Sequence, residues 1–447
     1  MKLKNKNVLV YGLGKSGLGA IKLLKKLKSK IFVYDDIKEN LENFCNDNII
    51  KVYEINEDFL RKTDLIIVNP CVSQYCENLK LASLLKVKMI SEIELAYLFS
   101  KGKIISVTGS NGKSTTSTLI YNMFKLANKK ASLVGNIGYS YSEEVSKNKK
   151  QTYIVEVSSF QLETIDKYHS NCSAFLNFSE NHLDRHFSLK NYFETKCRIF
   201  NRVKNKDFKI LNYDDEKVKN IKFDKNYYYF SLNQKVKGAY FFNDNIYFNN
   251  GKTEEFILHK SSIKLMGEHN IQNVLCAIIV AKLYKIKNEI IKKAVESFFG
   301  IEHRIEFVEN INGVNYYNDS KSTTVKATLT ALNCFKNNSV ILILGGSDKG
   351  FDFNDLFSNM PSYVKCIVAI GEVKERVLNN AKENGFYNVY LIDDFFNSIK
   401  FSKNLAESEN YDTVLLSPAT ASYDMFTSFE QRGETFKNLV KELKGEN

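Results

Sequence analysis

The segment Thr108–Thr116, TGSNGKSTT, limits the possible folds of this chain more than any other part of its sequence. It follows an apolar run with β-strand character, Ile104–Val107, and precedes a segment with helical periodicity, Leu119–Leu126. A strand, a glycine loop and a helix in this order bind nucleotide phosphates, because backbone N–H groups and the helix N-terminus face the anionic oxygens. The segment therefore predicts an α/β fold with a phosphate-binding loop at the end of a strand.

The side chains of this loop suit a nucleoside triphosphate and its metal ion. Lys113 supplies a positive charge, and Ser114 or Thr115 supplies a hydroxyl group for Mg²⁺. The usual loop also has a glycine five residues before Gly112, where this chain has Val107. The residues that we expect to contact ATP in this loop are Gly109, Ser110, Asn111, Gly112, Lys113, Ser114 and Thr115.

Length and composition are those of a soluble multidomain protein. A chain of 447 residues is long enough for two to four domains, and 44% hydrophobic and 26% charged residues are ordinary values. No apolar run reaches the roughly 18 residues of a membrane span. Lys15 and four glycines interrupt the apolar stretch near the N-terminus, so we interpret it as a strand and a turn rather than a signal peptide. We expect a cytoplasmic protein.

Charge and cysteine usage exclude several classes of protein. The net charge of +12 comes from lysines spread along the whole chain, without an arginine-rich arm, so we expect no nucleic-acid partner and no membrane partner. Eight scattered cysteines form no CxxC pair, which favours reduced thiols over a zinc site or disulfides. Only seven of the 63 basic residues are arginines, so each arginine is a candidate for a position that needs a planar fork.

Three stretches of alternating strand-like and helical patterns follow one another, which is typical of parallel α/β sheets. Residues 218–265 differ, because the runs YYYFSL and AYFFNDNIYFNNG predict antiparallel hairpins. We therefore predict a three-domain α/β fold. Residues 1–97 form a Rossmann-like domain, residues 98–301 a central P-loop-type ATPase domain with a small antiparallel part, and residues 302–447 a second Rossmann-like domain.

The first turn of the chain, GLGKSG at Gly12–Gly17, matches the fingerprint of dinucleotide-binding folds. Asp35, at the end of the next strand, completes the pattern with an acid for a ribose hydroxyl group. The pattern places a diphosphate over a helix N-terminus, but NAD and a UDP-sugar both present a diphosphate and a ribose. A glycine turn without a ligand is the structural alternative. The motif predicts a site and leaves its ligand open.

Two further loops of the central domain carry groups that suit catalysis. Glu156 ends the strand YIVEV beside the phosphate loop, where a carboxylate can hold Mg²⁺; a strand-end glutamate that faces solvent is the alternative. The loop Asn181–His186, NHLDRH, follows another strand, and His182 is either a metal ligand or a hydrogen-bonded loop histidine. Lys196, in NYFETKCRIF, has by itself the context of an ordinary surface lysine.

In the third domain, HRIE lies at the domain junction, and NDSKST, LGGSDKGFDF and LSPATASYDMF each end a strand. Carboxyl ends of parallel strands meet at one edge of a sheet, which is where open α/β sheets bind ligands. Lys321, Lys349, Thr323 and Ser422 would form a cationic, hydroxyl-lined cup there. Such a cup suits an acidic small molecule.

Taken in order, the motifs of the whole chain resemble the Mur ligase family. They are TGSNGKSTT, GNIG, EVSSFQLE, NHLDRH, YFETKCRIF, GEHNIQN, HRIE, NDSKST, GGSDKG and LSPATAS. The chain has no DNPR segment and ends with the motif LSPATASYDMF. In both respects it resembles the branch of the family that adds D-glutamate. The resemblance implies a monomer that uses UDP-N-acetylmuramoyl-L-alanine, D-glutamate and ATP. It also implies that the alanine carboxylate is phosphorylated before the amine of glutamate attacks.

The resemblance further implies roles for individual residues. It assigns catalysis to Lys113, Lys196, His182 and Glu156, and the metal ligands of two Mg²⁺ ions to Ser114, Glu156, His182 and a carbamylated Lys196. Beyond the phosphate loop, it places ATP at Asn270, Asn273, Arg304 and Asp319. It places the UDP-substrate at Gly12, Gly14, Lys15, Ser16, Gly17, Asp35 and Asn136. It places glutamate at Lys321, Thr323, Lys349, Ser422 and Phe429.

The sequence departs from the family pattern at two positions. Cys71 stands where the family commonly has the glycine of an SPG turn, which bears on muramoyl contacts, and Thr420 stands where many relatives have cysteine.

Other functions remain as alternatives to this interpretation. A sister ligase that adds L-alanine or L-glutamate is one alternative. A dinucleotide-dependent oxidoreductase fused to an ATPase, or a nucleotide-binding switch without chemistry, belongs to a different class.

Overall fold

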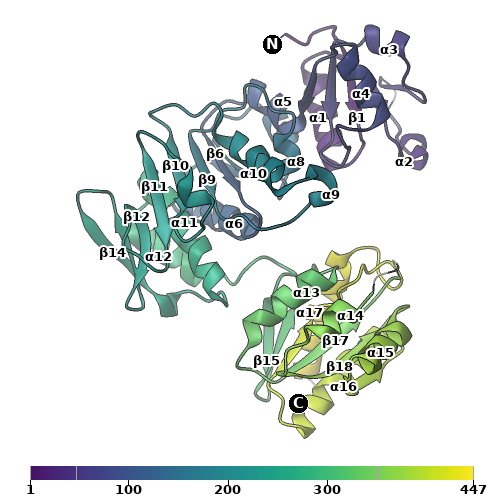
Figure 1. Ribbon diagram of the computed structural model, residues 1–447, viewed down its shortest axis with the longest axis vertical. Coiled ribbons are helices and arrows are strands. Elements are labelled where there is room, and N and C mark those ends of the chain that lie inside the picture. The colour runs from purple at the N-terminus through teal and green to yellow at the C-terminus, as the bar shows by residue number, and fades with distance from the viewer. Residues whose placement is uncertain (1, 47, 349, 351, 446–447) are drawn as a thin grey trace. The chain divides into compact units, whose positions relative to one another are not determined.

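The computed structural model describes residues 2–46, 48–348, 350 and 352–445. The chain forms two compact units, Met1–Ile263 with Glu268–Ser297 and Lys264–Gly267 with Phe298–Asn447. Three sheets account for its strands, and each has helices packed on it (Figure 1). The first two sheets lie in the first unit and the third sheet in the second unit.

The first sheet has the order β3-β2-β1-β4-β5 and is parallel throughout. Its strands are β1 (Asn7–Tyr11), β2 (Lys30–Tyr34), β3 (Ile50–Lys51), β4 (Leu65–Val68) and β5 (Met89–Ser91). Its helices are α1 (Lys15–Lys26), α2 (Lys38–Glu42), α3 (Glu57–Arg61), α4 (Glu77–Leu84) and α5 (Glu92–Phe99). The strand order reverses between β1 and β4, so the glycine turn after β1 lies at the edge where such sheets bind nucleotides.

The second sheet has the order β14-β13-β12-β11-β10-β9-β6-β8-β7. Its strands are β6 (Ile104–Thr108), β7 (Ala131–Gly135), β8 (Thr152–Glu156), β9 (Cys172–Phe175), β10 (Phe208–Asn212), β11 (Tyr227–Ser231), β12 (Gly238–Phe242), β13 (Asn245–Asn249) and β14 (Glu254–His259). The helices are α6 (Lys113–Leu126), α7 (Tyr141–Ser146), α8 (Ser159–Leu162), α9 (Leu183–His186), α10 (Leu189–Cys197), α11 (Glu268–Leu283) and α12 (Asn288–Glu296). The strand β6 lies between β8 and β9, third from the β7 edge, so the loop after β6 opens beside the ends of these two strands.

The prediction of antiparallel hairpins for residues 218–265 is half right. The strands β12, β13 and β14 do pair in antiparallel fashion. The YYYFSL strand, β11, is instead parallel to both β10 and β12. The strand pattern predicts that a run is extended but not its direction. Gly238, the first residue of β12, pairs with Tyr229 of β11, and a Cβ atom there would lie 1.9 Å from the Tyr229 carbonyl oxygen.

The third sheet has the order β15-β16-β20-β17-β18-β19. Its strands are β15 (Glu306–Ile311), β16 (Val314–Asn318), β17 (Val340–Gly345), β18 (Val364–Ile370), β19 (Val389–Leu391) and β20 (Thr413–Leu416). The helices are α13 (Val325–Leu332), α14 (Asn354–Ser358), α15 (Lys374–Glu383), α16 (Phe395–Ser408) and α17 (Phe429–Gly445). Sequence analysis missed β15, an antiparallel edge strand. The predicted three-domain α/β class is confirmed, and the boundaries at residues 97 and 301 stay predictions.

Helices α1 and α7 join the first sheet to the second. Ala20 and Leu24 of α1 share one hydrophobic cluster with Tyr141 and Val145 of α7. A salt bridge of 2.6 Å from Lys22 to Glu143 borders this contact. Among the described residues, no helix has both the length and the apolar character that a bilayer crossing requires.

The contact between α1 and α7 leaves no room for a side chain at Gly19. A Cβ atom there would lie 1.9 Å from Ser140 Oγ, which is held in place by its 2.7 Å hydrogen bond to Glu92. We expect Gly19→Ala to lower the free energy of unfolding of the first unit by about 1–3 kcal/mol. Urea unfolding tests this, with the exposed Leu18→Ala as a control that should stay within about 0.5 kcal/mol of the unsubstituted protein. Equal stability of the two variants would contradict the prediction.

Candidate active site

The phosphate loop has the backbone geometry that its glycines predict. Gly112 has φ 78° and is the N-cap of α6, so the helix N-terminus faces the loop. A Cβ atom on Gly112 would lie 2.2 Å from Asn273 Oδ1, so a larger residue would both strain the turn and collide with α11. The same Asn273 oxygen accepts a hydrogen bond of 3.2 Å from Thr116. Asn273, a predicted ATP residue, thus lies against the loop. Its Nδ2 donates a 3.0 Å hydrogen bond to Oδ1 of Asn270, the second predicted ATP residue of this helix.

A second set of hydrogen bonds holds the loop to the end of β9. Asn177 accepts from the Asn111 backbone N–H at 2.8 Å and donates to the Asn111 carbonyl at 3.2 Å. Ser110 donates to the Ser179 carbonyl and accepts from the Ser179 N–H, both at 3.0 Å. Sequence analysis missed Asn177, although an asparagine at a strand end, in AFLNF, was a signal for such a contact.

Lys113 and Lys196 both donate to a single backbone carbonyl. Lys113 Nζ lies 2.9 Å from the Gly109 oxygen, and Lys196 Nζ lies 2.8 Å from the same oxygen. Lys113 also donates to the Ser110 carbonyl at 2.9 Å. Two amines that are 83 residues apart in sequence therefore meet at the floor of the phosphate loop.

Lys196 is almost fully buried, with 1% of its surface exposed. Burial, followed by the positive charge of Lys113, holds the pKa of Lys196 well below the ordinary value for a lysine. The amine also lies 4.7 Å from the centre of the Tyr192 ring. The interpretation of Lys196 as an ordinary surface lysine is wrong, because the side chain is buried and the pKa of its amine is lowered.

Glu156 is buried at the end of β8, and only one of its two carboxylate oxygens has a hydrogen-bond partner among the described residues. Its Oε1 accepts a 2.8 Å hydrogen bond from Asn136, and its Oε2 has no hydrogen-bond donor in the described part of the chain. The alternative of a glutamate that faces solvent is wrong, since the residue is 0% exposed. A buried carboxylate oxygen with no donor fits a cation as its missing partner. Asn136, predicted for the UDP-substrate, here orients this carboxylate.

His182 is exposed and occupies a left-handed backbone position, with φ 54°, directly before α9. Its ring packs edge-on against Phe160 at 4.9 Å and lies 6.1 Å from the Tyr192 ring. Tyr192 thus contacts both predicted metal ligands of this region, His182 and Lys196.

The glycine turn of the first sheet is braced by Asp35. One Asp35 oxygen accepts from the Leu13 N–H at 2.6 Å, and the other accepts from Ile37 at 3.0 Å. The carboxylate predicted for a ribose hydroxyl group therefore also shapes the turn. Lys15, at the start of α1 beside Ser16, donates to the Gly138 carbonyl of the GNIG turn. The turns that follow β1 and β7 thus lie next to each other.

In the second unit, loops after β16, β17 and β20 lie side by side. The Ala419 N–H donates to the Ser322 carbonyl at 2.9 Å, and the Ser347 N–H donates to the Ala421 carbonyl at 3.0 Å. These contacts place Lys321, Thr323 and the buried Ser422 in one loop cluster, where Lys321 Nζ lies 5.6 Å from the Phe429 ring. Lys349, the fifth predicted glutamate-binding residue, lies outside the described residues.

Arg432 connects these loops, and sequence analysis gave it no role. The guanidinium group is 0% exposed and donates to the carbonyls of Ser320, Thr420 and Ala421 at 3.0–3.2 Å. Burial lowers the pKa of Arg432 to about 10. The scarcity of arginine in the chain was a signal for such a role. Arginine can donate to several carbonyls in one plane, whereas the single ammonium group of lysine cannot.

Asp319 and Arg304, predicted to contact ATP, differ in environment. Arg304 is exposed, whereas Asp319 is 1% exposed. Asp319 accepts from the Ser417 hydroxyl at 2.7 Å and from the Ile305 N–H at 3.2 Å. Burial raises the pKa of Asp319 to about 6, against the opposing effect of these hydrogen bonds.

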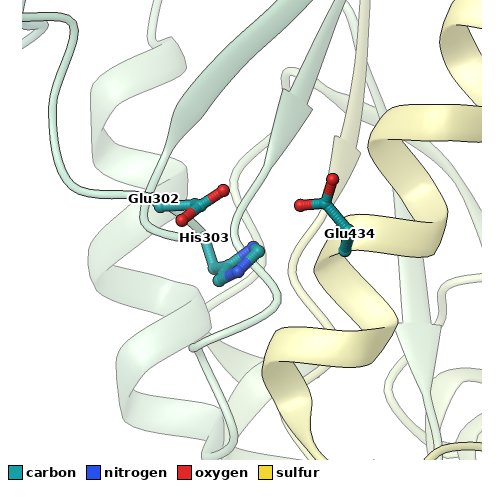
Figure 2. Close-up of side chains that lie close together, drawn as sticks. All are labelled: Glu302, His303 and Glu434. Atoms are coloured by element: carbon teal, nitrogen blue, oxygen red, sulfur yellow. The ribbon is translucent and has the colours of Figure 1, made fainter.

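One acidic cluster of the second unit has the spacing of metal ligands. Glu302, His303 and Glu434 offer ligand atoms within 4.8 Å of one another, with Glu434 on α17 facing the other two (Figure 2). Lys437 already forms ion pairs with Glu302 and, at 2.8 Å, with Glu434. His303 forms a 3.0 Å hydrogen bond with Asn318. We interpret the group as an ion-pair cluster at the start of β15.

A cavity of about 710 Å³ lies at the opposite edge of the second sheet. Its lining consists of Tyr121, Ala131, Gln151, Lys125, Lys129, Lys130, Lys149 and Lys150. These residues lie in the second half of α6, at the start of β7 or just before β7 and β8, whereas the phosphate loop follows the carboxyl end of β6. The cavity is therefore not part of the site that the motifs define.

Family models match three consecutive parts of the chain. The Mur ligase MurD-like N-terminal domain matches residues 6–91, and the Mur ligase middle domain matches residues 107–281. The Mur ligase glutamate ligase domain matches residues 303–420.

Curated relatives match the chain over its whole length. A UDP-N-acetylmuramoylalanine–D-glutamate ligase from Thermoanaerobacter sp. (strain X514) is 38% identical over 456 residues, which cover 99% of this chain and 100% of the relative. The chain belongs to the Mur ligase family. A Mur ligase of the same name from Clostridioides difficile (strain 630) is 38% identical over 459 residues, with 99% and 100% coverage.

Solved Mur ligases share the fold. The crystal structure of UDP-N-acetylmuramate–alanine ligase from Thermotoga maritima has a TM-score of 0.57 at 16% identity and covers 98% of this chain and 100% of its own. A MurF ligase from Thermotoga maritima in complex with ADP has a TM-score of 0.53 at 16% identity, with 99% and 96% coverage. The predicted Mur ligase family is thus confirmed, and the roles of single residues stay predictions.

The environment of Asp319 predicts a pH dependence for the second unit of this Mur ligase. Its folded-state pKa of about 6 lies above the unfolded value of 3.8, so the folded state keeps the proton longer. The contribution of Asp319 to stability is therefore present below about pH 4 and is lost as the pH rises to 6. From pH 4 to pH 7 we expect Asp319→Asn to gain roughly 2.4 kcal/mol relative to the unsubstituted protein. Denaturant unfolding at both pH values measures this difference, and parallel pH profiles would contradict it.

Proposed function

We propose that this Mur ligase joins D-glutamate to UDP-N-acetylmuramoyl-L-alanine with ATP as the energy source. One observation supports this choice of substrates. The chain is 35–38% identical, over 99% of its length, to curated UDP-N-acetylmuramoylalanine–D-glutamate ligases from several bacteria. The fold alone is shared with ligases of other names and does not separate them. The reaction forms an amide bond in a precursor of peptidoglycan and so serves cell-wall growth and division.

The phosphate loop supplies the charge that the first step needs. The alanine carboxylate attacks the γ-phosphoryl group of ATP, and the product is an acyl phosphate with ADP as the leaving group. Both reactants are anions, so positive charge has to surround the transferred group. Lys113, held at the loop floor by the Gly109 and Ser110 carbonyls, and the N–H groups at the start of α6 provide it.

The residues beside the loop fit Mg²⁺. Glu156 offers a buried oxygen without a donor, Ser114 offers a hydroxyl group at the start of α6, and His182 offers an exposed imidazole. When bound, Mg²⁺ would neutralise the phosphate charge and orient the γ-phosphoryl group. Asn136 keeps the Glu156 carboxylate in one orientation through its 2.8 Å hydrogen bond.

Lys196 suits a carbamate in this site. Carbamylation joins the amine nitrogen to CO₂ with loss of a proton, and it requires a neutral amine. Burial and the charge of Lys113 lower the pKa of Lys196, which favours that neutral form. The resulting carboxylate would replace a cation that repels Mg²⁺ with an oxygen ligand that attracts it.

The acyl phosphate then reacts with glutamate. The amine of glutamate attacks the carbonyl carbon, a tetrahedral intermediate forms, and phosphate leaves an amide behind. We assign the binding of glutamate to the loop cluster with Lys321, Thr323, Ser422 and Phe429, whose ammonium and hydroxyl groups complement two carboxylates. We assign the UDP end to the glycine turn after β1, with Lys15 and Asp35 beside it.

Membership of the family weakens the alternatives. A dinucleotide-dependent oxidoreductase would need a hydride-transfer site, and the three family models match most of the chain to ligase domains. A sister ligase that adds L-alanine or L-glutamate would share the fold but not the name that the full-length relatives carry.

A phosphate-release assay tests the proposed function. We expect phosphate to appear only when UDP-N-acetylmuramoyl-L-alanine, ATP and D-glutamate are all present, because each step consumes the product of the one before. L-glutamate and L-alanine serve as the comparison amino acids. Release that does not depend on glutamate, or that is faster with L-alanine, would overturn the proposal.

The role of Lys196 has its own test. We expect Lys196→Ala to reduce kcat by about 100-fold or more, as the loss of a charged group at a transferring phosphoryl does. Added short-chain carboxylic acids should restore part of the activity, because they can occupy the space that the truncated side chain leaves. Lys190→Ala, at an exposed position on the same helix, should keep its activity. Full activity of Lys196→Ala would rule out the carbamate.

A further inference from the structure

Arg185 connects the loop that contains His182 to the segment that follows β4 in the first domain. Neither the NHLDRH motif nor the proposed reaction assigns a role to Arg185. Its guanidinium group forms a two-point contact with Glu163, with Nε donating at 3.0 Å and Nη2 at 2.6 Å. Nη2 also donates to the Val72 carbonyl at 2.9 Å, and Nη1 lies 3.4 Å from the Cys71 carbonyl. The Phe160 ring lies under the guanidinium group at 4.4 Å.

The ends of this contact belong to different parts of the first unit. Cys71 and Val72 follow β4 of the first sheet, Glu163 follows α8, and Arg185 lies within α9. The side chains of Arg185 and Glu163 are 10% and 4% exposed, so water screens their interaction little. A second contact runs parallel to it, since the rings of Tyr75 and Phe187 pack edge-on at 5.0 Å.

The segment held by Arg185 also supports the glycine turn of the UDP site. A Cβ atom on Gly12 would lie 2.6 Å from the Asn69 Cβ and 3.2 Å from a Val72 methyl group, so the turn and this segment are in close contact. Asn69 accepts from the Cys71 N–H at 3.0 Å, which fixes the segment internally. A continuous set of contacts therefore runs from the glycine turn, through Val72 and Arg185, to the loop of His182.

We infer that Arg185 is a positioning residue that sets the muramoyl end of the substrate against the phosphate loop, an inference that rests on the proposed function. The substrate spans the distance from the glycine turn to the γ-phosphoryl group, so any change between the two loops misplaces the reacting carboxylate. Small misplacements of that kind cost large factors in rate. Arg185 holds backbone carbonyls, so its contact survives the replacement of the family glycine by Cys71.

The conservative variant Arg185→Lys distinguishes the effect of the Arg185 hydrogen bonds from the effect of its positive charge. Lysine keeps the positive charge but cannot hold Glu163 at two points and two carbonyls at once. We expect the Kd and KM for UDP-N-acetylmuramoyl-L-alanine to rise about tenfold, while the Kd for UDP alone and the KM for ATP change less than twofold. Isothermal titration without ATP or Mg²⁺ gives the Kd values, and phosphate release gives the KM values.

Glu163→Gln is the partner variant, and Arg202→Lys is the matched control. Glu163→Gln removes the charge that orients the fork and should show the same pattern even if Arg185→Lys fails to fold. Arg202 is 57% exposed and forms a longer, 3.7 Å ion pair with Asp166, so its replacement should leave all four constants unchanged. Unchanged substrate affinity in both test variants, or an equal loss of UDP affinity, would overturn the inference.

Hydrogen exchange gives a readout that does not depend on the substrate. Amides in a peptide covering residues 69–76 should exchange about tenfold faster in Arg185→Lys, while amides of β6 keep their protection. Unchanged exchange in residues 69–76 would refute the tie between the loops. Failure of the unsubstituted protein to bind UDP-N-acetylmuramoyl-L-alanine would instead refute the proposed function, and the exchange result would still decide whether Arg185 holds the segment.

Discussion

The Gly109 carbonyl, with Lys113 and Lys196 both donating to it, is the interaction on which the site depends. Two ammonium groups at one oxygen repel each other, and burial makes the repulsion stronger. The structure resolves the conflict through Lys196, whose pKa lies well below that of an ordinary lysine. Lys113 donates to the Ser110 carbonyl as well, and under the proposed function it is the phosphate ligand of the pair. Under the proposed function, Lys113 thus serves phosphate binding, while the lowered pKa of Lys196 favours the neutral amine that carbamylation requires.

This division of roles requires a rigid loop, and the central sheet provides it. The loop follows β6, which is buried throughout between β8 and β9. Asn177 holds it from the side of β9, and Asn273 approaches Gly112 from α11. Glu156 ends the neighbouring strand β8, so its free oxygen and the loop share one edge of the sheet. The positions of the phosphate loop and of Glu156 are therefore set by the ends of neighbouring strands.

Motifs at strand ends could be predicted from the sequence, because they depend on residues that are adjacent in the chain. The glycine turn, the phosphate loop and the loops after β16, β17 and β20 belong to this class. Contacts between distant residues could not be predicted in the same way. Lys196 has the local pattern of a surface residue, and only packing of α10 under the loop buries it. The direction of β11 depends likewise on its neighbours in the sheet and not on its own alternation.

The arginines show how composition and packing together point to function. Three of the seven, Arg185, Arg198 and Arg432, donate to two or more backbone carbonyls across loops. Arg198 holds the carbonyls of Glu163 and Ile165, so the segment that carries the partner of Arg185 is itself fixed by a second fork. A chain that uses lysine for most of its positive charge needs arginine where several carbonyls must be held in one plane. Such positions lie beside the proposed substrate sites of both units, which is where loops have to keep a defined geometry although no regular hydrogen-bond ladder supports them.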